Sequence, residues 1–381
     1  MIRQGEFRQP AIESVVFGRA AGDVLRDKLD AAGLQRAFLV SGRSLGALQD
    51  GPLQRIEAAL GGRVAGRFAG VRAHTPREDV VAAALQARDA HADVVIAVGG
   101  GSVIDAAKGV LVCLWMGIDD PDALDPLTQI VAPPSPIRLL SVSTTLSAAE
   151  FTPFAGITHT PTQTKQAFPH PLLVPRTVVL DPAAPLHTPM PLLRSTAVRS
   201  VDHAVETWCS PMAHAGTEAL SLQGLTLLAR ALRRMGGDQL DAEAALDAQF
   251  GMWQAILPAS AGVPTGASHG IGYALGAGFG VGHGETSCVM LPAVMQWNAR
   301  MGDARQSRLA AAMEQPGVPL ADALRALIGS LGLPTRLRDV GIREADFPEI
   351  ARRALQYPSL AASAHPVTTI EQVQEILQLA W

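Results

Sequence analysis

Short runs of consecutive apolar residues alternate with a longer stretch of helical spacing in the first half of the chain. The runs at 37–40 (AFLV) and 94–98 (VVIAV) are apolar throughout and end at Ser or Gly, which is typical of strands buried on both faces of a parallel sheet. Residues 77–90 between them space their apolar side chains as a helix does. Further strands are expected at 137–142 and 176–180. This alternation predicts a doubly wound α/β domain.

The second half of the chain has a different pattern. Beyond Pro191 the strand-like runs disappear, and Ala- and Leu-rich stretches such as 216–235 and 241–257 predict helices. Between the two regions several prolines break regular structure. They are Pro182, Pro185, Pro189 and Pro191. At 381 residues the chain exceeds what one core usually fills. We therefore predict a two-domain α/β plus all-α protein, with a nucleotide-binding domain at 1–184 and a helical domain at 185–381.

Composition narrows the class of protein. Hydrophobic residues make up 48% and charged residues 17%, a balance typical of a compact globular enzyme. The formal charge of -4 indicates no nucleic-acid partner. The three cysteines lie far apart without a C-x-x-C pair, which favours free thiols in a reducing compartment. The opening MIRQGEFRQP lacks a signal peptide's apolar run, and glycines and charges interrupt the apolar segment 94–116. We expect a cytoplasmic protein without a membrane partner.

A glycine-rich turn follows the second predicted strand. Gly99, Gly100, Gly101 and Ser102 come directly after VVIAV and before a stretch with helical spacing. Glycines lack Cβ, so backbone N–H groups can approach a diphosphate, and the positive end of the following helix favours its charge. A tight turn without any ligand would use the same residues. The turn by itself therefore leaves both interpretations open.

The full string GGGSVIDAAK resembles the signature GGGS-x-x-D-x-A-K of the iron-containing alcohol dehydrogenases. The segments STTLSAAEFTPFAGIT and VPRTVVLDP resemble other stretches of that family. The resemblance implies a dehydroquinate synthase-like fold whose first domain binds NADH or NADPH. The residues it implies as cofactor contacts are Gly99, Gly100, Gly101, Ser102, Asp105, Lys108, Thr144, Thr145 and Leu180. Asp105 and Lys108 would face the cofactor cleft, or form an ordinary ion pair on the helix surface.

Cofactor choice is expected to depend on the tip of the first predicted strand. An Asp or Glu at that tip would exclude the 2′-phosphate of NADPH. Here Ser41, Gly42 and Arg43 follow the strand, so we expect the site to accept NADPH as well as NADH. The alternative is that Arg43 is a solvated loop charge.

Three histidines stand out by their placement. His203 lies in the helical stretch RSVDHAVETW, and His269 and His283 lie fourteen residues apart in glycine-rich surroundings. In the resembling family, a D-x-x-x-H helix and two histidines at this separation ligate one divalent ion, and the closing HG…LP pattern is present as HGETSCVMLP. The resemblance implies that His203, His269 and His283 would be the ligands if iron or zinc is bound.

The fourth ligand position departs from the family pattern. Four residues before His203, where metal-binding members carry Asp, this chain has Arg199. Residues at i and i+4 share a helix face, and a guanidinium has no lone pair to give a metal. Three imidazoles can still hold zinc, so a metal-bound site stays open, but a metal-free site is favoured. Loss of this Asp resembles the maleylacetate reductase branch, in which Asn is the usual residue.

We therefore predict hydride transfer from NADH or NADPH to a small, anionic, unsaturated keto acid or another carbonyl compound, as in aromatic catabolism. The active site is expected in a cleft between the domains of a homodimeric enzyme. Arg199 would stabilise negative charge on the substrate, unless it only pairs with Asp202 or Glu206. Candidates for the proton donor are His203, His269, His283 and Tyr273. The alternatives are a metal-dependent alcohol dehydrogenase on the same fold and an inactive nucleotide-binding sensor.

Overall fold

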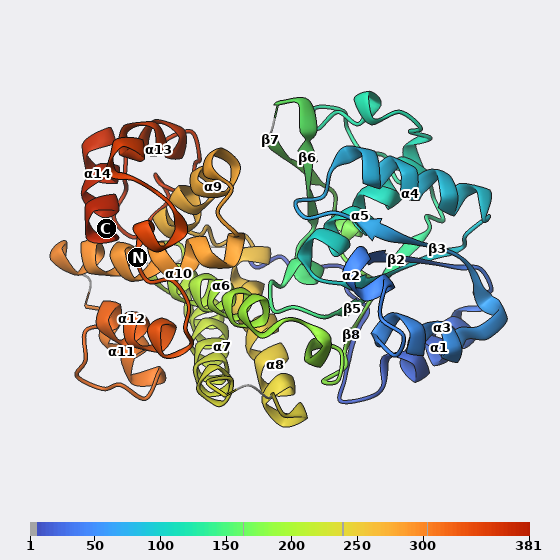
Figure 1. Cartoon of the computed structure of the whole chain (residues 1–381), viewed down its shortest axis with the longest axis horizontal. Helices are drawn as coiled ribbons and strands as arrows, with labels where there is room; N and C mark the ends of the chain where they lie inside the picture. The colour runs from blue at the N-terminus through green and yellow to red at the C-terminus, as the bar shows by residue number, and fades with distance from the viewer. Residues whose placement is uncertain (1–5, 163, 238–239, 303) are drawn as a thin grey trace. The chain divides into compact units, whose positions relative to one another are not determined.

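The computed structural model describes residues 6–162, 164–237, 240–302 and 304–381, so the first five residues of the N-terminal segment lie outside it. The chain divides into two compact units (Figure 1). One unit is Pro10–Thr188, and the other is Pro189–Trp381 together with the described residues 6–9. Each unit has its own arrangement of secondary structure.

The first unit contains a six-stranded parallel sheet with the order β1-β8-β5-β4-β2-β3. Its strands are β1 (Ser14–Phe17), β2 (Ala37–Gly42), β3 (Val64–Val71), β4 (Val94–Gly99), β5 (Arg138–Ser143) and β8 (Thr177–Leu180). The four central strands are those that the apolar runs predict. The edge strands β1 and β3 were not predicted, because β1 is short and only partly buried and β3 contains two glycines and Arg67. An edge strand needs less apolar sequence than a central strand.

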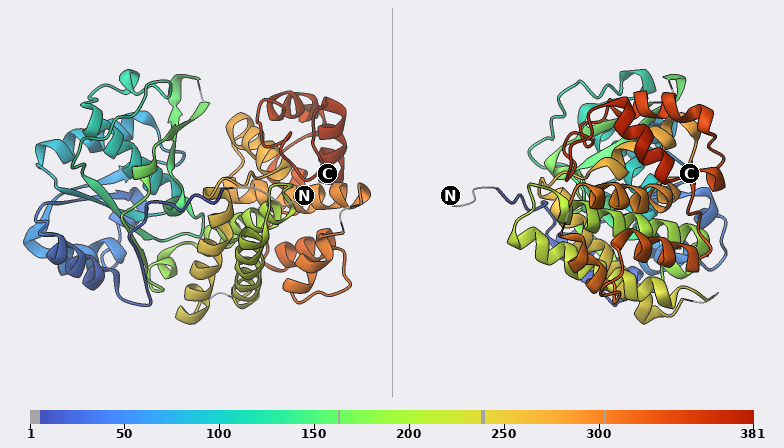
Figure 2. Two further views of the ribbon diagram at one scale, coloured as in Figure 1. Left: turned by 180° about the vertical axis from the view of Figure 1, so that it is seen from behind. Right: turned by 90° about the vertical axis from the view of Figure 1, so that its left-hand side faces the viewer.

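Two helices cover each face of this sheet (Figures 1 and 2). Helices α1 (Ala21–Ala32) and α3 (Pro52–Leu60) pack on one face, and α4 (Arg77–Asp89) and α5 (Gly101–Met116) pack on the other. Successive residues of a strand point to opposite faces. In β4, Val94, Ile96 and Val98 enter the core under α1 and α3, whereas Val95 and Ala97 enter the core under α4 and α5. The continuous apolar run in the sequence reflects this burial on both faces.

A separate antiparallel hairpin completes the first unit. It consists of β6 (Phe154–His159) and β7 (Thr164–Pro169). Helix α5 packs on β6 at Gly109, where a Cβ atom would lie 2.7 Å from both Ile157 and Val80. The short helix α2 (Arg43–Gly46) follows β2. The 3-10 turns of this unit are η1 (Gly61–Arg63), η2 (Pro121–Ala123), η3 (Ala149–Phe151), η4 (Thr160–Thr162), η5 (Pro171–Leu173) and η6 (Pro185–His187).

The second unit is helical throughout its described residues, as predicted. Its helices are α6 (Met190–Cys209), α7 (Ala215–Arg234), α8 (Ala242–Ser260), α9 (Ala267–Phe279), α10 (His283–Arg300), α11 (Gln306–Ala312), α12 (Leu320–Ser330), α13 (Phe347–Ala354) and α14 (Ile370–Leu379), with 3-10 turns η7 (Leu337–Val340) and η8 (Glu344–Asp346). Helix α6 packs against α7, α8 and α10 and is buried on all sides from Ser195 onward. Polar side chains of α6 therefore need partners inside the protein.

Close packing fixes the crossing of α6 and α10. A Cβ atom at Gly284 would lie 2.6 Å from the main-chain carbonyl carbon of Ser195, so no larger residue fits there without a backbone shift. This contact sets the position of the neighbouring His283 at the start of α10.

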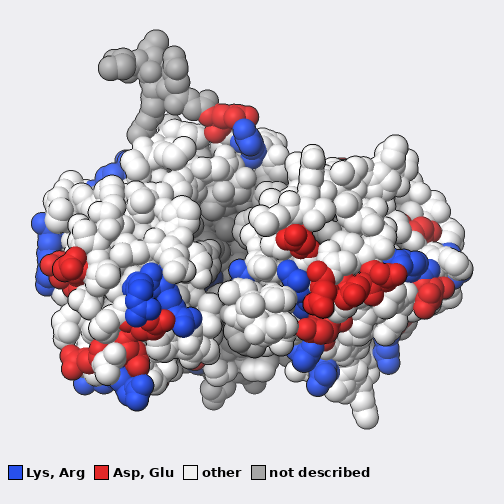
Figure 3. Space-filling model, turned by 90° about the horizontal axis from the view of Figure 1, so that it is seen from above, with Lys and Arg blue, Asp and Glu red and all other residues white. Residues whose placement is uncertain are grey.

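The surface agrees with the sequence composition. Among the described residues, no helix is long and apolar enough to cross a membrane. On the face seen in Figure 3, basic and acidic side chains are interspersed and form no single basic patch. Cys113, Cys209 and Cys288 are all buried free thiols, and burial raises the pKa of Cys113 to about 12. A thiol with so high a pKa is a poor nucleophile.

Candidate active site

The glycine turn between β4 and α5 is tightly packed against the loop that follows β5. A Cβ atom at Gly100 would lie 2.7 Å from Thr145, and one at Gly101 would lie 2.9 Å from Ser147 Oγ. The turn leads into the N-terminus of the sixteen-residue helix α5, whose first N–H groups have no partner within the helix. Free N–H donors, a helix dipole and the lack of side chains suit a diphosphate, so this turn fits a nicotinamide cofactor.

Other predicted cofactor residues lie around this turn. The backbone N–H of Thr144 donates to the carbonyl oxygen of Gly99 at 3.1 Å. The hydroxyls of Thr145 and Ser147 lie 3.2 Å apart, and Ser102 Oγ accepts a 3.2 Å hydrogen bond from the N–H of His74. The structure therefore brings together the glycines and the predicted threonines, which are distant in sequence.

Lys108 has a structural role instead of the predicted place at the cofactor. The side chain is fully buried, and its Nζ lies within hydrogen-bonding distance of the carbonyl oxygens of Ala149, Thr152 and Phe154, at 2.6, 2.8 and 2.9 Å, and of Thr152 Oγ1 at 3.1 Å. The ammonium group thus ties α5 to the loop before β6. Burial lowers the pKa of Lys108 to about 8.

Asp105 does not pair with Lys108 on the helix surface either. Its carboxylate lies 3.6 Å from Lys165 Nζ on β7, and the Asp105 side chain is mostly buried. The alternative of an Asp105–Lys108 ion pair assumed an exposed helix face. The packing of β6 against α5 buries that face instead.

Two further cofactor predictions fall on buried side chains. Strand β2 continues through Gly42, so Ser41 is only 1% exposed, and Leu180 of β8 is completely buried. Their side chains face the core, so these two residues can contact a ligand only through main-chain atoms. Arg43, in contrast, is exposed at the start of α2. Of the predicted strand tip, only Arg43 has a side chain that a cofactor can contact.

A buried polar cluster in the second unit surrounds Arg199. Arg199 Nη1 donates to Ser287 Oγ at 3.0 Å and lies 3.8 Å from Asp202 Oδ2. The same Asp202 oxygen accepts hydrogen bonds from Ser268 Oγ at 2.8 Å and from Ser287 Oγ at 2.7 Å. These residues come from α6, α9 and α10, so the cluster joins three helices. The alternative in which Arg199 pairs with Asp202 is therefore correct as far as this contact goes.

Glu206, one turn beyond Asp202 on α6, holds the N-terminus of α9. Its carboxylate accepts the N–H groups of Gly266 and Ser268, each at 2.7 Å, and the Nδ1–H of His269 at 2.8 Å. A carboxylate at a helix N-terminus satisfies free donors and interacts well with the helix dipole. The bond to Nδ1 orients the His269 ring and leaves Nε2 without a partner among the described residues.

The charges of the cluster shift the protonation of its members. Burial raises the pKa of Asp202, but the neighbouring His269 and Arg199 outweigh it and hold that pKa below its usual range. Burial and Arg199 lower the pKa of His269, but the carboxylates of Asp202 and Glu206 more than compensate and raise it. The pKa of His203 falls well below its usual value because of burial, His269 and Arg199. His203 is therefore neutral at pH 7.

The structure brings most of the predicted catalytic residues together. The rings of His203 and His269 are 4.9 Å apart, Tyr273 lies 6.2 Å from His269, and the Arg199 guanidinium carbon is 5.5 Å from the centre of the Tyr273 ring. His283 is the first residue of α10, and its ring lies 3.5 Å from a Cβ position at Gly276 of α9.

The donor atoms that come together differ from the predicted metal ligands. The predicted histidine triad does not form a group of ligand atoms within 4.8 Å; in the described ranges only Asp202, Glu206 and His269 do. In that group, Glu206 and the Nδ1 of His269 already hydrogen-bond to each other, and Arg199 lies beside Asp202. Replacing these bonds with a dication next to a guanidinium would cost free energy.

Sequence reasoning missed part of this cluster. Asp202 and Glu206 were considered only as partners of Arg199, and Ser268 and Ser287 were not identified. An acidic residue three positions after Arg199 is a visible signal for Asp202. Nothing in the sequence distinguishes the two serines, because their role depends on how α9 and α10 pack.

A parallel-sheet unit with a glycine turn, followed in the chain by a helical unit with a buried polar cluster, is the arrangement expected of a two-domain nicotinamide-dependent dehydrogenase. Comparison with known families agrees. Residues 13–182 match the model of the iron-containing alcohol dehydrogenases, and residues 194–381 match that of the C-terminal domain of the Fe-containing alcohol dehydrogenase family. The chain belongs to the iron-containing alcohol dehydrogenase family, and it is an oxidoreductase.

Individual relatives include reductases and dehydrogenases. The chain is 33% identical to the dehydrogenase FUM7 of Gibberella moniliformis, over 91% of this chain and 90% of that protein. It is 29% identical to maleylacetate reductase 1 of Cupriavidus pinatubonensis, over 91% and 90% of the two chains. The solved maleylacetate reductase of Agrobacterium tumefaciens superposes with a TM-score of 0.83 at 23% identity, covering 100% of this chain and 99% of that one. This last comparison shows the two-domain fold.

Proposed function

We propose that this protein reduces an unsaturated keto acid, or a related anionic carbonyl compound, with NADH or NADPH and without a bound metal ion. The observation that carries the proposal is the buried Arg199, at the helix position where the resembling metal enzymes have an acidic ligand. A guanidinium presents planar paired donors that match a carboxylate. Maleylacetate reductases among the relatives support an acidic substrate.

In this proposal the nicotinamide supplies the hydride. The cluster around Arg199 stabilises the negative charge on the substrate and donates the proton. Of the five N–H groups of Arg199, one donates to Ser287, so others are available to a substrate carboxylate or a developing enolate oxygen. His269 is the best-supported proton donor, because Glu206 holds Nδ1 and leaves Nε2 for the substrate. Tyr273 lies beside both residues and helps to exclude water.

A metal-dependent alcohol dehydrogenase is the second candidate. Three buried polar atoms lack a hydrogen-bond partner in the described part of the cluster, and an ion could satisfy some of them. These atoms are Asp202 Oδ1, His203 Nδ1 and His269 Nε2. The relative 1,3-propanediol dehydrogenase of Citrobacter freundii, at 30% identity, represents that chemistry.

Substrate and metal tests separate the two candidates. Protein purified without added metal should reduce maleylacetate-like keto acids with a kcat/KM at least about tenfold above that for neutral aldehydes, a difference of about 1.4 kcal/mol. A chelator should leave this activity unchanged, and elemental analysis should find far less than one iron or zinc ion per chain. Activity that is lost on metal removal and restored on its return would support the alcohol dehydrogenase instead.

Acceptance of both cofactors is the finer part of the proposal. No acidic residue follows β2 in the segment 41–46, and Arg43 is exposed there. Steady-state kinetics should therefore show activity with NADPH as well as NADH, and Arg43→Ala should raise the KM for NADPH only. A preference of the wild type for NADH above about a hundredfold, or about 2.7 kcal/mol, would contradict this expectation.

A further inference from the structure

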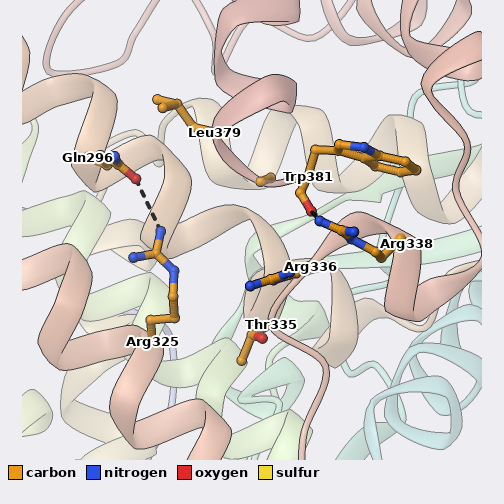
Figure 4. Close-up of a pocket in the computed structure, with 8 residues that line it drawn as sticks. Gln296, Arg325, Thr335, Arg336, Arg338, Leu379 and Trp381 are labelled. Atoms are coloured by element: carbon orange, nitrogen blue, oxygen red, sulfur yellow. Dashed lines mark hydrogen bonds between the residues drawn. The ribbon is translucent and has the colours of Figure 1, made fainter.

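A pocket that contains no residue of the Arg199 cluster lies in the helical unit (Figure 4). Its volume is about 420 Å³, within the range of about 300–1,000 Å³ that is usual for small-molecule sites. Its lining residues come from α10, α12, the segment around η7 and the end of α14. They are Gln296, Arg325, Thr335, Arg336, Arg338, Leu379, Ala380 and Trp381. Three of these residues are arginines and none is acidic.

Backbone contacts give the pocket a defined frame. The N–H of Leu337 donates to the carbonyl oxygen of Ala380 at 2.9 Å, which joins η7 to the end of α14. Arg338 donates from Nε and Nη2 to the main-chain oxygen of Trp381 at 2.9 and 2.7 Å, and its guanidinium stacks 5.3 Å from the Trp381 ring centre. The donors of Arg338 are therefore used in holding the C-terminal residue in place.

Arg336 and Arg325 are the arginines with capacity for a ligand. Asp339 fixes the backbone of Arg336 by accepting its N–H at 3.0 Å, but the Arg336 guanidinium has no acceptor among the described residues. Figure 4 shows this side chain extending toward Arg325. Arg325 is oriented by Gln296 Oε1 at 3.1 Å and by Asp322 at 3.2 Å, which leaves some of its donors unused. The two guanidiniums converge on one side of the pocket.

The charge balance of the pocket favours an anion. Like charges held near one another are unfavourable unless counter-charges compensate them. Asp322 pairs with Arg325 outside the lining, and the carboxylate of Trp381 pairs with Arg338, so the excess positive charge of the lining is that of Arg336. Leu379 and the Trp381 ring add an apolar wall, and the Thr335 hydroxyl adds a further donor.

We propose that this pocket binds a small organic anion with at least two carboxylate or phosphoryl groups, held chiefly by Arg336 and Arg325. The forked guanidinium donors match both kinds of acidic group, and a ligand with a short carbon skeleton fits beside Leu379. None of the lining residues belongs to the Arg199 cluster or to the glycine turn. The pocket is therefore built from other residues than those assigned to the proposed reaction.

Calorimetric titration of the whole protein tests the proposal. The probes are citrate and, separately, pyrophosphate, at physiological salt and with saturating NADH so that neither probe enters the glycine turn. The two variants used here, Arg336→Ala and Arg343→Ala, should fold because both arginine side chains are exposed. Arg336→Ala should weaken binding at least about tenfold, the loss expected for one charge-assisted pair of hydrogen bonds. Arg343→Ala is the matched control, because Arg343 is likewise exposed and pairs with Asp346, and neither residue lines the pocket.

The outcomes decide the site and its chemistry. Tighter binding of citrate that depends on Arg336 assigns a carboxylate ligand, and tighter binding of pyrophosphate assigns a phosphoryl ligand. Arg336→Lys keeps the charge but lacks the fork, so it should restore only part of the affinity. No saturable binding of either probe would overturn the proposal, as would equal weakening by Arg343→Ala and Arg336→Ala.

Discussion

Lys108 and Arg199 are both buried cations, one in each unit, but their surroundings differ. The Lys108 ammonium lies among four uncharged oxygens within 3.1 Å, three of them main-chain carbonyls. Arg199 has one hydroxyl at 3.0 Å and a carboxylate at 3.8 Å. An ammonium has three donors and a guanidinium has five. The acceptors around Lys108 are enough for all its N–H donors. The acceptors around Arg199 are fewer than its donors.

This difference separates a structural cation from a functional one. A saturated buried charge stabilises the loops that supply its acceptors, and a ligand would have to displace them. A buried charge with unused donors is costly unless something else uses them. Burial alone, which is similar for the two residues, does not make this distinction.

The largest expected effect is the loss of stability on replacing Lys108. Lys108→Met removes the ammonium and leaves its carbonyl partners buried without a donor, so the free energy of unfolding should fall by about 3–5 kcal/mol. Urea unfolding curves of the two proteins measure the change. Lys165→Met, which removes the more exposed partner of Asp105, is the control and should cost less than about 1 kcal/mol. Similar losses of unfolding free energy in both variants would contradict the structural role of Lys108.

Replacing Arg199 should affect catalysis more than stability. Arg199→Ala should lower kcat/KM for an anionic keto acid by about a hundredfold, or about 2.7 kcal/mol, because it removes a charged donor from the reacting region. The loss for a neutral aldehyde should stay below about tenfold. Arg199→Lys should recover only part of the activity, since a point charge does not copy the fork. Equal, small losses on both substrates together with a lowered thermal midpoint would make Arg199 a structural residue like Lys108.

A smaller effect is expected from the partner of Arg199. Asp202→Asn keeps the shape but removes the charge that orients Arg199 and raises the pKa of His269. We expect kcat to fall about tenfold while the KM for an anionic substrate does not rise, because the cluster becomes more positive. Steady-state kinetics on the keto acid measure this split. Unchanged kinetics with reduced thermal stability would show that Asp202 only supports the helices.

The central part of the fold is predictable from sequence because burial on both faces leaves a simple signal. Strand β4 reads as five consecutive apolar residues, since Val94, Ile96 and Val98 fill one core and Val95 and Ala97 the other. The edge strand β3, with Arg67 and two glycines, carries no such signal. The helical unit was predictable from its long Ala- and Leu-rich stretches, of which α7 and α8 are examples.

The candidate site was only partly predictable. Motifs located the glycine turn and the residues Arg199, His203 and His269. Of these, Arg199 and His203 share the helix α6, where their spacing fixes a common face. The position of His283 depends on how α10 meets α9, and the role of Lys108 depends on a loop more than forty residues away. Neither relation follows from local sequence. Packing between elements therefore accounts for most of the errors.

The pairing of Arg199 with Asp202 also constrains how such a site changes over generations. The two residues lie one turn apart on a buried helix. Arg199→Asp alone would place two carboxylates side by side, and neutralising Asp202 alone would leave the guanidinium without its counter-charge; each step costs stability. A change at position 199 should therefore cost less stability when position 202 changes with it than when either position changes alone.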